Sequence, residues 1–188
     1  MPQAFQLETA RLILRPWRES DRAPFAAMNT DPEVMTYFAS RMTAAESEEA
    51  IARYQAAYDR DGFGFFAAEI RDTRTFAGII GAQTMRDAVP NLPQPAVEIG
   101  WRLPRTFHGK GFATEGARAI VDFAFNTLSL TEVVAVTALG NLASRHVMEK
   151  LGMIRRPDLD FDHPRVPADH PHHRHALYQL KNPLLAAV

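Results

Sequence analysis

The chain has no cysteine among its 188 residues, and it carries almost no net charge. Without cysteine there is no disulfide framework, no thiol nucleophile and no thiolate zinc site. The net charge of −1 and the sequence pI near 6.7 argue against a broad electrostatic role on nucleic acid or on an anionic membrane. We therefore expect neither nucleic acid nor a membrane as a partner.

Long apolar runs are absent as well. No run approaches the roughly 20 residues that cross a bilayer. The N-terminal sequence MPQAFQLETARL also lacks the basic-then-apolar pattern of a secretion signal. These absences favour a cytoplasmic protein. The length and the 46% hydrophobic composition fit a single domain over residues 1–188, because domains usually run to about 100–200 residues.

Short strands and amphipathic helices alternate along the chain. Residues 43–46, TAAE, predict a capped helix start, because the threonine hydroxyl can accept from the third helical N–H while the glutamate reaches back. A Pro-rich linker covers residues 90–95. The apolar periodicity predicts helices that start near 19–21, 43, 113 and 141, and Asp61-Gly62 should end the second of them. Strands are predicted at 11–16, 65–70, 76–81, 97–103, 132–137 and 175–180, with one more directly after Met153.

The most informative stretch runs from Glu98 to Phe125, where a strand passes through Gly109-Lys110-Gly111 into an amphipathic helix. Two glycines let backbone N–H groups turn toward a ligand, and the helix adds unpaired N–H groups and the positive end of its dipole. A Walker loop does not fit, because Phe112 follows Gly111. A dinucleotide fingerprint fits poorly, because Thr114 replaces its third small residue.

Residues 108–113, HGKGFA, resemble the acyl-CoA loop of the GNAT superfamily of N-acetyltransferases. The family pattern is Arg/Gln-x-x-Gly-x-Gly/Ala between a strand and a helix. The agreement includes EIGW before the loop and ATEGA after it. His108 stands where the family usually has Arg or Gln, but the loop works mainly through backbone amides. The resemblance therefore implies a pyrophosphate site for acetyl-CoA.

Two further segments extend the resemblance over nearly the whole chain. Residues 141–153, NLASRHVMEKLGM, resemble the superfamily's second CoA-side motif, and residues 7–16, LETARLILRP, resemble the opening of the RimJ/RimL-like, ribosomal-protein-acetyltransferase branch. The resemblance implies an α/β (α+β) fold, with a mixed, mostly antiparallel central sheet of about seven strands and helices on both faces.

The resemblance also implies where the cofactor binds. The strand should offer backbone amides to the acetyl carbonyl, the loop and first helical turn should hold the pyrophosphate, and one residue of the second motif should contact CoA or cap its helix. Gly100 either lets the thioester approach the backbone or marks a bulge. The predicted cofactor-binding residues are Ile99, Gly100, Trp101, His108, Gly109, Lys110, Gly111, Phe112, Ala113, Thr114 and Asn141.

The implied reaction is direct attack of a primary amine on the thioester. Deprotonating a lysine side chain at pH 7 costs about 4.6 kcal/mol, whereas an α-amine costs only about 1–1.4 kcal/mol. The branch resemblance favours a protein N-terminal α-amine as the acceptor. A small-molecule amine or antibiotic, and a CoA-binding regulatory module without turnover, remain open alternatives, as does a homodimer.

Two side chains are candidates for the proton transfers. Glu98 is the candidate base, because it lies on the strand that resembles the family's catalytic strand and faces away from Ile99; a carboxylate paired with a neighbouring arginine is the alternative. Ser144 is the candidate acid by resemblance to the Asn-x-x-Ser motif, and a local role in the first helical turn is its alternative. Tyr178, the only tyrosine after the loop, is less favoured.

Histidines crowd one short segment near the C-terminus. Such tracts can bind metal through neutral imidazole. Prolines interrupt this one, however, and acidic residues make it equally a polar loop. We expect no metal site, and we interpret the segment as a loop near the acceptor site. The histidines are His163, His170, His172, His173 and His175.

Overall fold

The structure is a computed structural model in which residues 5–185 are described; both ends of the predicted 1–188 domain, residues 1–4 and 186–188, lie outside that range. The described chain contains a nine-stranded sheet with the strand order β1-β2-β3-β4-β5-β6-β9-β7, and β8 pairs with β9. The strands are β1 Leu7–Glu8, β2 Leu12–Arg15, β3 Phe65–Ile70, β4 Phe76–Thr84, β5 Val97–Arg102, β6 Glu132–Ala138, β7 Ile154–Arg155, β8 Phe161–Asp162 and β9 Arg174–Lys181.

Every described strand pairing is antiparallel except that of β5 with β6. The predicted mixed, mostly antiparallel sheet is therefore confirmed. It has nine strands rather than about seven. The strand expected after Met153 is β7, and the two additional strands, β1 and β8, are each two residues long. A strand of that length shows no alternation of apolar and polar residues, so periodicity cannot reveal it.

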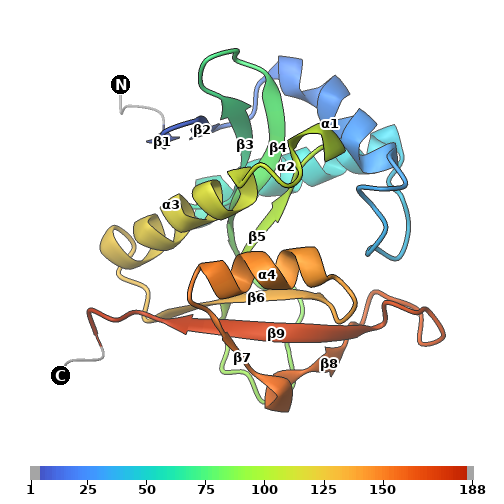
Figure 1. Cartoon of the computed structure of the whole chain (residues 1–188), viewed down its shortest axis with the longest axis vertical. Coiled ribbons are helices and arrows are strands. Elements are labelled where there is room, and N and C mark those ends of the chain that lie inside the picture. Colours follow the sequence, from blue (N-terminus) through green and yellow to red (C-terminus); the bar gives the residue numbers. More distant parts are fainter. Residues whose placement is uncertain (1–4, 186–188) are drawn as a thin grey trace.

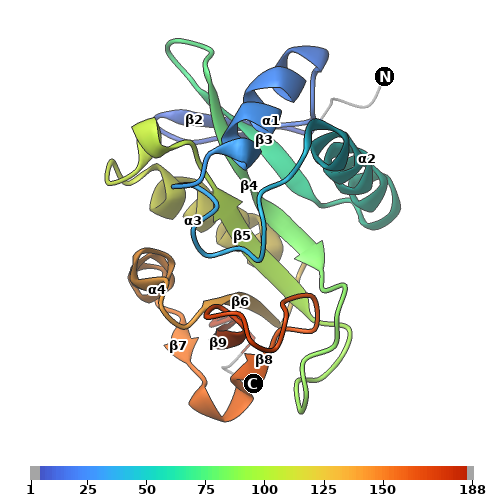
Figure 2. The same cartoon turned by 90° about the vertical axis from the view of Figure 1, so that its right-hand side faces the viewer.

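Helices cover both faces of the sheet, as predicted (Figures 1 and 2). The α-helices of the described chain are α1 Arg22–Thr30, α2 Ala44–Asp61, α3 Phe112–Asn126 and α4 Leu142–Lys150. Helices α3 and α4 pack on one face and α1 and α2 on the other, because the two largest apolar clusters divide between them. No described helix is both long and apolar enough to cross a membrane.

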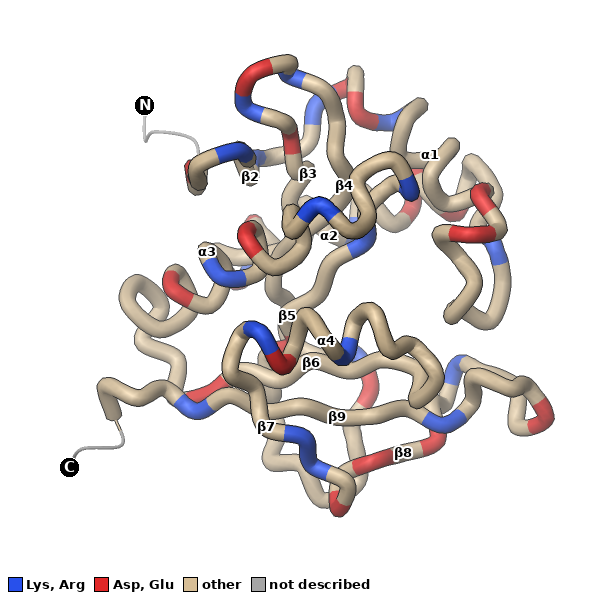
Figure 3. Tube along the Cα trace, in the orientation of Figure 1, with Lys and Arg blue, Asp and Glu red and all other residues tan. Residues whose placement is uncertain are grey.

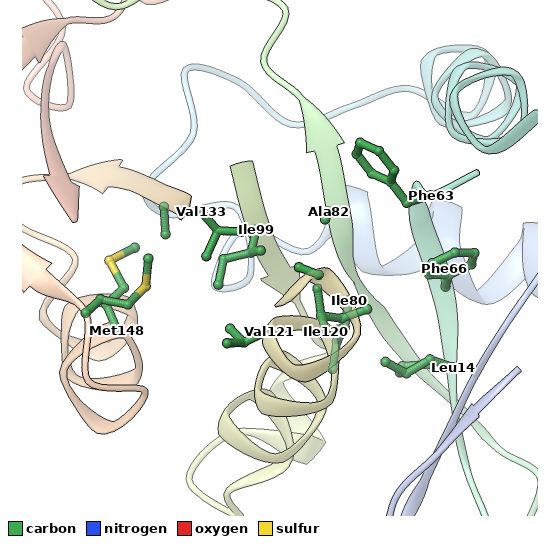
Figure 4. Close-up of a cluster of buried hydrophobic side chains, with 14 of the residues drawn as sticks. Leu14, Phe63, Phe66, Ile80, Ala82, Ile99, Ile120, Val121, Val133 and Met148 are labelled. Carbon is green, nitrogen blue, oxygen red and sulfur yellow. The ribbon is translucent and has the colours of Figure 1, made fainter. Parts of the chain in front are cut away.

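The larger cluster fixes the central strands against α3 and α4. Ile99 of β5 lies among Ile120 and Val121 of α3, with Met148 of α4 and Val133 of β6 close by (Figure 4). Ile99 is 1% exposed, and burying such a side chain contributes about 1.5–3 kcal/mol. Because side chains alternate along a strand, this anchoring turns Glu98, Gly100 and Arg102 toward the face of α1 and α2.

Local signals set the helix ends where the sequence predicts them. The Thr43 hydroxyl accepts from the Glu46 N–H, and Glu46 bonds back to Thr43, which completes the capping box of α2. Gly62 ends α2 in a left-handed conformation with φ 76°. The connection between β4 and β5, which contains the Pro-rich linker, also contributes to the core, because Val89 and Leu92 are buried in a third apolar cluster beside β6 and β9.

Charges of both signs are interspersed along the described trace, so neither half of the fold is lined by one sign (Figure 3). The most deeply buried charged cluster joins Arg15 to Asp21 at 2.7 Å and to Glu69 at 2.6 Å. All three of these side chains are at most 4% exposed. The Arg15 guanidinium is therefore surrounded by carboxylates, which offset the cost of burying its charge.

Candidate functional site

The central strands separate where the sequence predicts the acetyl group. Strands β5 and β6 run parallel but share a single register pair, Glu98 with Val134. On its other edge β5 pairs continuously with β4 from Val97 to Arg102. Beyond Glu98, the β6 edge of β5 therefore carries backbone groups without a strand partner, which is where a carbonyl oxygen can be held by an N–H.

The glycine loop presents backbone amides to the surface at the start of α3. Gly109 and Gly111 have φ values of 71° and 81°, a region that other residues rarely adopt. No side chain caps α3, and no acceptor among the described residues takes a hydrogen bond from the N–H groups of residues 109–114. Free amides and the positive end of the helix dipole together make an anion site.

Arg11 holds this loop from outside, which sequence reasoning missed. Its Nη1 donates to the Lys110 carbonyl at 2.9 Å, and its guanidinium carbon lies 4.3 Å from the centre of the Phe112 ring. Its Nε donates to Glu115 at 2.6 Å, and the Thr9 hydroxyl donates to the same carboxylate. The Thr-Ala-Arg of the N-terminal motif therefore ties β2 to the loop, and that motif was the available signal.

The side chains of His108 and Phe112 contact neighbouring protein groups and support the loop, whereas its backbone N–H groups form the anion site. The His108 imidazole turns back, with Nε2 2.8 Å from the Leu103 carbonyl, so it supports the loop from within. Phe112 packs edge-to-face on Phe107 with ring centres 5.8 Å apart. Next to the loop is a hollow of about 550 Å³ lined by Glu8, Thr9, Gly111, Thr114, Glu115, Arg118, Ala119, Asp122 and Lys150.

The second motif caps its own helix. Asn141 accepts from the Ser144 N–H at 3.2 Å, and its Nδ2 donates to Thr137 Oγ1 at 2.9 Å and to Ser144 Oγ at 3.2 Å. Asn141 is thus the N-cap of α4, as predicted. The Ser144 hydroxyl receives a hydrogen bond and makes none to a described residue, so its own proton is available.

The Tyr178 hydroxyl already has two hydrogen-bond partners within the protein. It donates to Glu149 at 3.2 Å and accepts from Arg145 at 3.1 Å, and the residue is 1% exposed. A buried hydroxyl held by two partners is poorly placed to protonate a leaving group. This observation supports the choice of Ser144 over Tyr178.

Glu98 lies half-buried on the opposite face from Ile99, as predicted. It stands directly across from Gln83 of β4, with no arginine within salt-bridge distance among the described side chains. Burial raises the pKa of Glu98 to about 7, although the Gln83 hydrogen bond and the charge of Arg165 work against that rise. A carboxylate that titrates near neutrality suits general-base chemistry better than an ordinary one.

Packing against the Phe65 ring explains why residue 100 is a glycine. The β4–β5 register is continuous through Gly100, so there is no bulge. A Cβ at this position would lie 3.1 Å from the ring of Phe65, which occupies the space above it. On this face the missing side chain admits Phe65. The predicted cofactor contact of Ile99, Gly100 and Trp101 therefore rests on the backbone edge that faces the opening toward β6.

The histidine segment meets two other loops. His172 packs against Tyr37, from the segment between α1 and α2, with ring centres 5.2 Å apart. Arg165 forms an ion pair with Asp87 at 2.8 Å, which ties the segment to the connection between β4 and β5. Figure 2 shows the α1–α2 segment crossing in front of β5, with the residue 163–173 segment below it. Among residues 5–185, no group of three or more His, Asp or Glu side chains is arranged to hold a metal.

Comparison with known proteins identifies this arrangement. A sequence profile described as "Acetyltransferase (GNAT) domain" matches residues 11–154. The chain belongs to the GNAT family of acetyltransferases. Members of this family take the acetyl group from acetyl-CoA, so the chain is an acetyl-CoA-dependent N-acetyltransferase.

Two curated relatives resemble the GNAT chain in sequence. The uncharacterized protein YkkB of Bacillus subtilis is 33% identical over 149 residues, which cover 79% of this chain and 84% of the relative. The FsC-acetyl coenzyme A-N(2)-transacetylase of Aspergillus fumigatus is 32% identical over 151 residues, 78% of this chain and 64% of the relative.

Solved structures share the GNAT fold. An acetyltransferase from Agrobacterium tumefaciens aligns with a TM-score of 0.76 and 25% identity over 95% of each chain. The ribosomal-protein-S5-alanine acetyltransferase from Vibrio fischeri aligns with a TM-score of 0.75 over 95% of this chain and 97% of that one. Its 16% identity shows a shared fold alone.

Proposed function

We propose that this GNAT enzyme transfers acetyl to a primary amine by direct attack in a ternary complex, with a protein N-terminal α-amine as the favoured acceptor. The observation that carries the proposal is the run of N–H groups at residues 109–114 that have no described acceptor, beside the opening between β5 and β6. The amides bind the pyrophosphate of acetyl-CoA, and the thioester lies in the opening.

The remaining cofactor contacts follow from that position. Backbone amides of Ile99–Trp101 hold the acetyl carbonyl, and they hold it more strongly once it becomes an oxyanion. Asn141 contacts the CoA arm from the N-terminus of α4. His108 acts through its support of the loop.

Glu98 acts as the general base of this reaction and Ser144 as the general acid. A neutral amine attacks the thioester carbon, a C–N bond forms and the C–S bond then breaks. Glu98 takes the amine proton through a water molecule, and the Ser144 hydroxyl protonates the departing thiolate and regains its proton from solvent water. The raised pKa of Glu98, about 7, is close to that of an α-amine, so proton transfer between them is nearly balanced.

The RimJ/RimL-like branch supplies the preference for a protein N-terminus. The LETARLILRP opening carries that resemblance, and its Thr9 and Arg11 contact Glu115 of the cofactor helix. A small-molecule amine is the second candidate acceptor. The 32% identity to a relative named for transfer from acetyl-CoA to an N(2) group is the observation in its favour.

The test is acceptor-dependent release of free thiol from acetyl-CoA, measured over a panel of peptides with free N-termini and small primary amines. We expect Glu98→Gln to lower kcat at least about 100-fold on the best acceptor. Glu49→Gln, the same change on the exposed side of α2, should leave kcat unaltered. Tight CoA binding without thiol release on any acceptor would contradict the proposal in favour of a regulatory module.

A further inference from the structure

Arg102 is a half-buried cation without a carboxylate partner on the acceptor face of β5. It lies four residues after Glu98, on the same face, and its register partner on β4 is Ile79. At about 3.3 Å per residue, the two Cα atoms are about 13 Å apart along the strand. No acidic oxygen of the described residues lies within 4.0 Å of its guanidinium, whereas the buried Arg15 has two such partners.

A neutral network holds the Arg102 guanidinium in place. Its Nη1 donates to Asn29 Oδ1 at 2.7 Å and approaches the sulfur of Met42 at 3.7 Å. Asn29 is fully buried, and its Nδ2 donates to Ser47 Oγ at 3.0 Å, which fixes the amide with its oxygen toward Arg102. The network positions the cation and does not neutralise it.

The rest of the guanidinium has no described acceptor. Nη1 makes both of the hydrogen bonds described above, and Nε is buried with no partner. The ring of Phe38 stacks on the guanidinium at 4.2 Å, and Phe38 itself is 40% exposed. Burial lowers the pKa of Arg102, and no nearby carboxylate reverses that effect. Burying a charge without a counterion is unfavourable, so a bound anion would stabilise the Arg102 guanidinium. The Nε–Nη2 edge has the geometry that pairs with a carboxylate.

We propose that Arg102 binds a carboxylate of the acceptor, so that the substrate is a primary amine that also carries an anionic group. This inference rests on the proposed acetyl transfer and adds the class of acceptor. The amine points toward Glu98 and the carboxylate toward Arg102. Phe38 and Met42, from the segment between α1 and α2, enclose the anion and shift to admit it.

The separation of the two groups favours one source of the carboxylate. The amine and carboxylate of a single α-amino acid are adjacent, whereas Glu98 and Arg102 are about 13 Å apart at their Cα atoms. A peptide with an acidic side chain in its first few residues spans that distance more readily. The chemistry is shared with small ω-amino acids, so both kinds of molecule enter the test.

The experiment compares matched acceptor pairs that differ only in the anion. One pair is a peptide with Glu at position 2 or 3 and its Gln counterpart, and the other is a short ω-amino acid and the alkylamine of equal length. For wild type we expect kcat/KM to be about 10- to 100-fold higher with the anion in at least one pair. Arg102→Gln should bring that ratio close to 1, and Arg102→Lys should retain part of it.

Arg53→Gln, an exposed change on α2, is the matched control and should keep the wild-type ratio. Thermal unfolding of each variant separates loss of fold from loss of preference. A wild-type ratio near 1 on both pairs, or a ratio that survives in folded Arg102→Gln, overturns the role of Arg102 while acetyl transfer stands. If no amine in either pair is acetylated, the proposed function fails as well.

Discussion

Arg11 and Glu115 are 104 residues apart in sequence and meet through three contacts beside the cofactor loop. The Arg11 backbone N–H donates to Oε1 at 2.8 Å, its Nε donates to Oε2 at 2.6 Å, and its Nη2 lies 2.6 Å from the same oxygen. Burial would raise the pKa of Glu115, but hydrogen bonds from Thr9 and Arg11 hold that pKa below its ordinary value. The pair joins β2 to the first turn of α3.

This connection predicts coupling between the two residues in cofactor binding. Arg11→Gln and Glu115→Gln should each raise the Kd for acetyl-CoA by about 3- to 5-fold, because either one releases the loop. The double variant should lose little more binding free energy for acetyl-CoA than either single variant. The expected coupling free energy is about 0.5–1 kcal/mol, because the arginine of the pair is half-exposed. Calorimetric titration measures this. Strictly additive losses would show that the pair does not act as a unit, and Arg60→Gln at the exposed Arg60–Asp61 pair is the control.

Glu98 should make the stability of the protein depend on pH. Its pKa is about 7 in the folded protein and near 4.5 when exposed, so the folded state binds this proton more tightly. The resulting stabilisation is complete below about pH 4.5 and is lost as pH rises through about 7. Glu98→Gln has no proton to lose, so relative to wild type it should gain about 1–3 kcal/mol between these limits.

Urea unfolding of wild type and Glu98→Gln at about pH 5, 6, 7 and 8 measures the difference. Glu115→Gln is the control, because the lowered pKa of Glu115 puts its titration below this range and the difference should stay flat. A flat difference for Glu98→Gln would mean that Glu98 is ionised at all these pH values, as in an ordinary surface carboxylate.

Substitution of Asn141 should affect mainly stability, whereas substitution of Ser144 should affect mainly kcat. Asn141→Ala removes the cap of α4 and should cost about 1 kcal/mol of stability. Ser144→Ala keeps that cap, because the Ser144 backbone N–H still donates to Asn141. Its stability should stay within about 0.5 kcal/mol of wild type while kcat falls about 10- to 100-fold. Unfolding curves and steady-state kinetics together decide the point; unchanged kcat in a folded Ser144→Ala protein would remove Ser144 from the chemistry.

The parts of the fold that follow from local chemistry could be predicted from the sequence. The Thr43–Glu46 capping box, the Gly62 helix end and the Asn141 cap each depend on residues a few positions apart. The glycine loop belongs to the same class, because Gly109 and Gly111 impose their own backbone conformation. Such signals are readable without knowledge of tertiary contacts.

Non-local relationships could not be predicted in this way. The Arg11–Glu115 contact joins distant segments, and nothing near Arg102 in sequence shows that Asn29 will hold it without a carboxylate. Gly100 is a glycine because Phe65 lies over it, and its sequence neighbours give no sign of that. Strands β1 and β8 are two residues long and exist only because β2 and β9 pair with them.

The most direct test of the account is which backbone amides meet the cofactor. In an isotope-labelled sample titrated with CoA, we predict that the amide resonances of residues 109–114 show the largest shifts. The amide of Gly62, which donates to Tyr58 at the end of α2, should not move. Gly111→Asp should abolish these shifts and weaken CoA binding at least about 10-fold, because it places a negative charge and a strained backbone at the pyrophosphate site. CoA binding that left residues 109–114 unshifted in wild type would contradict the central claim.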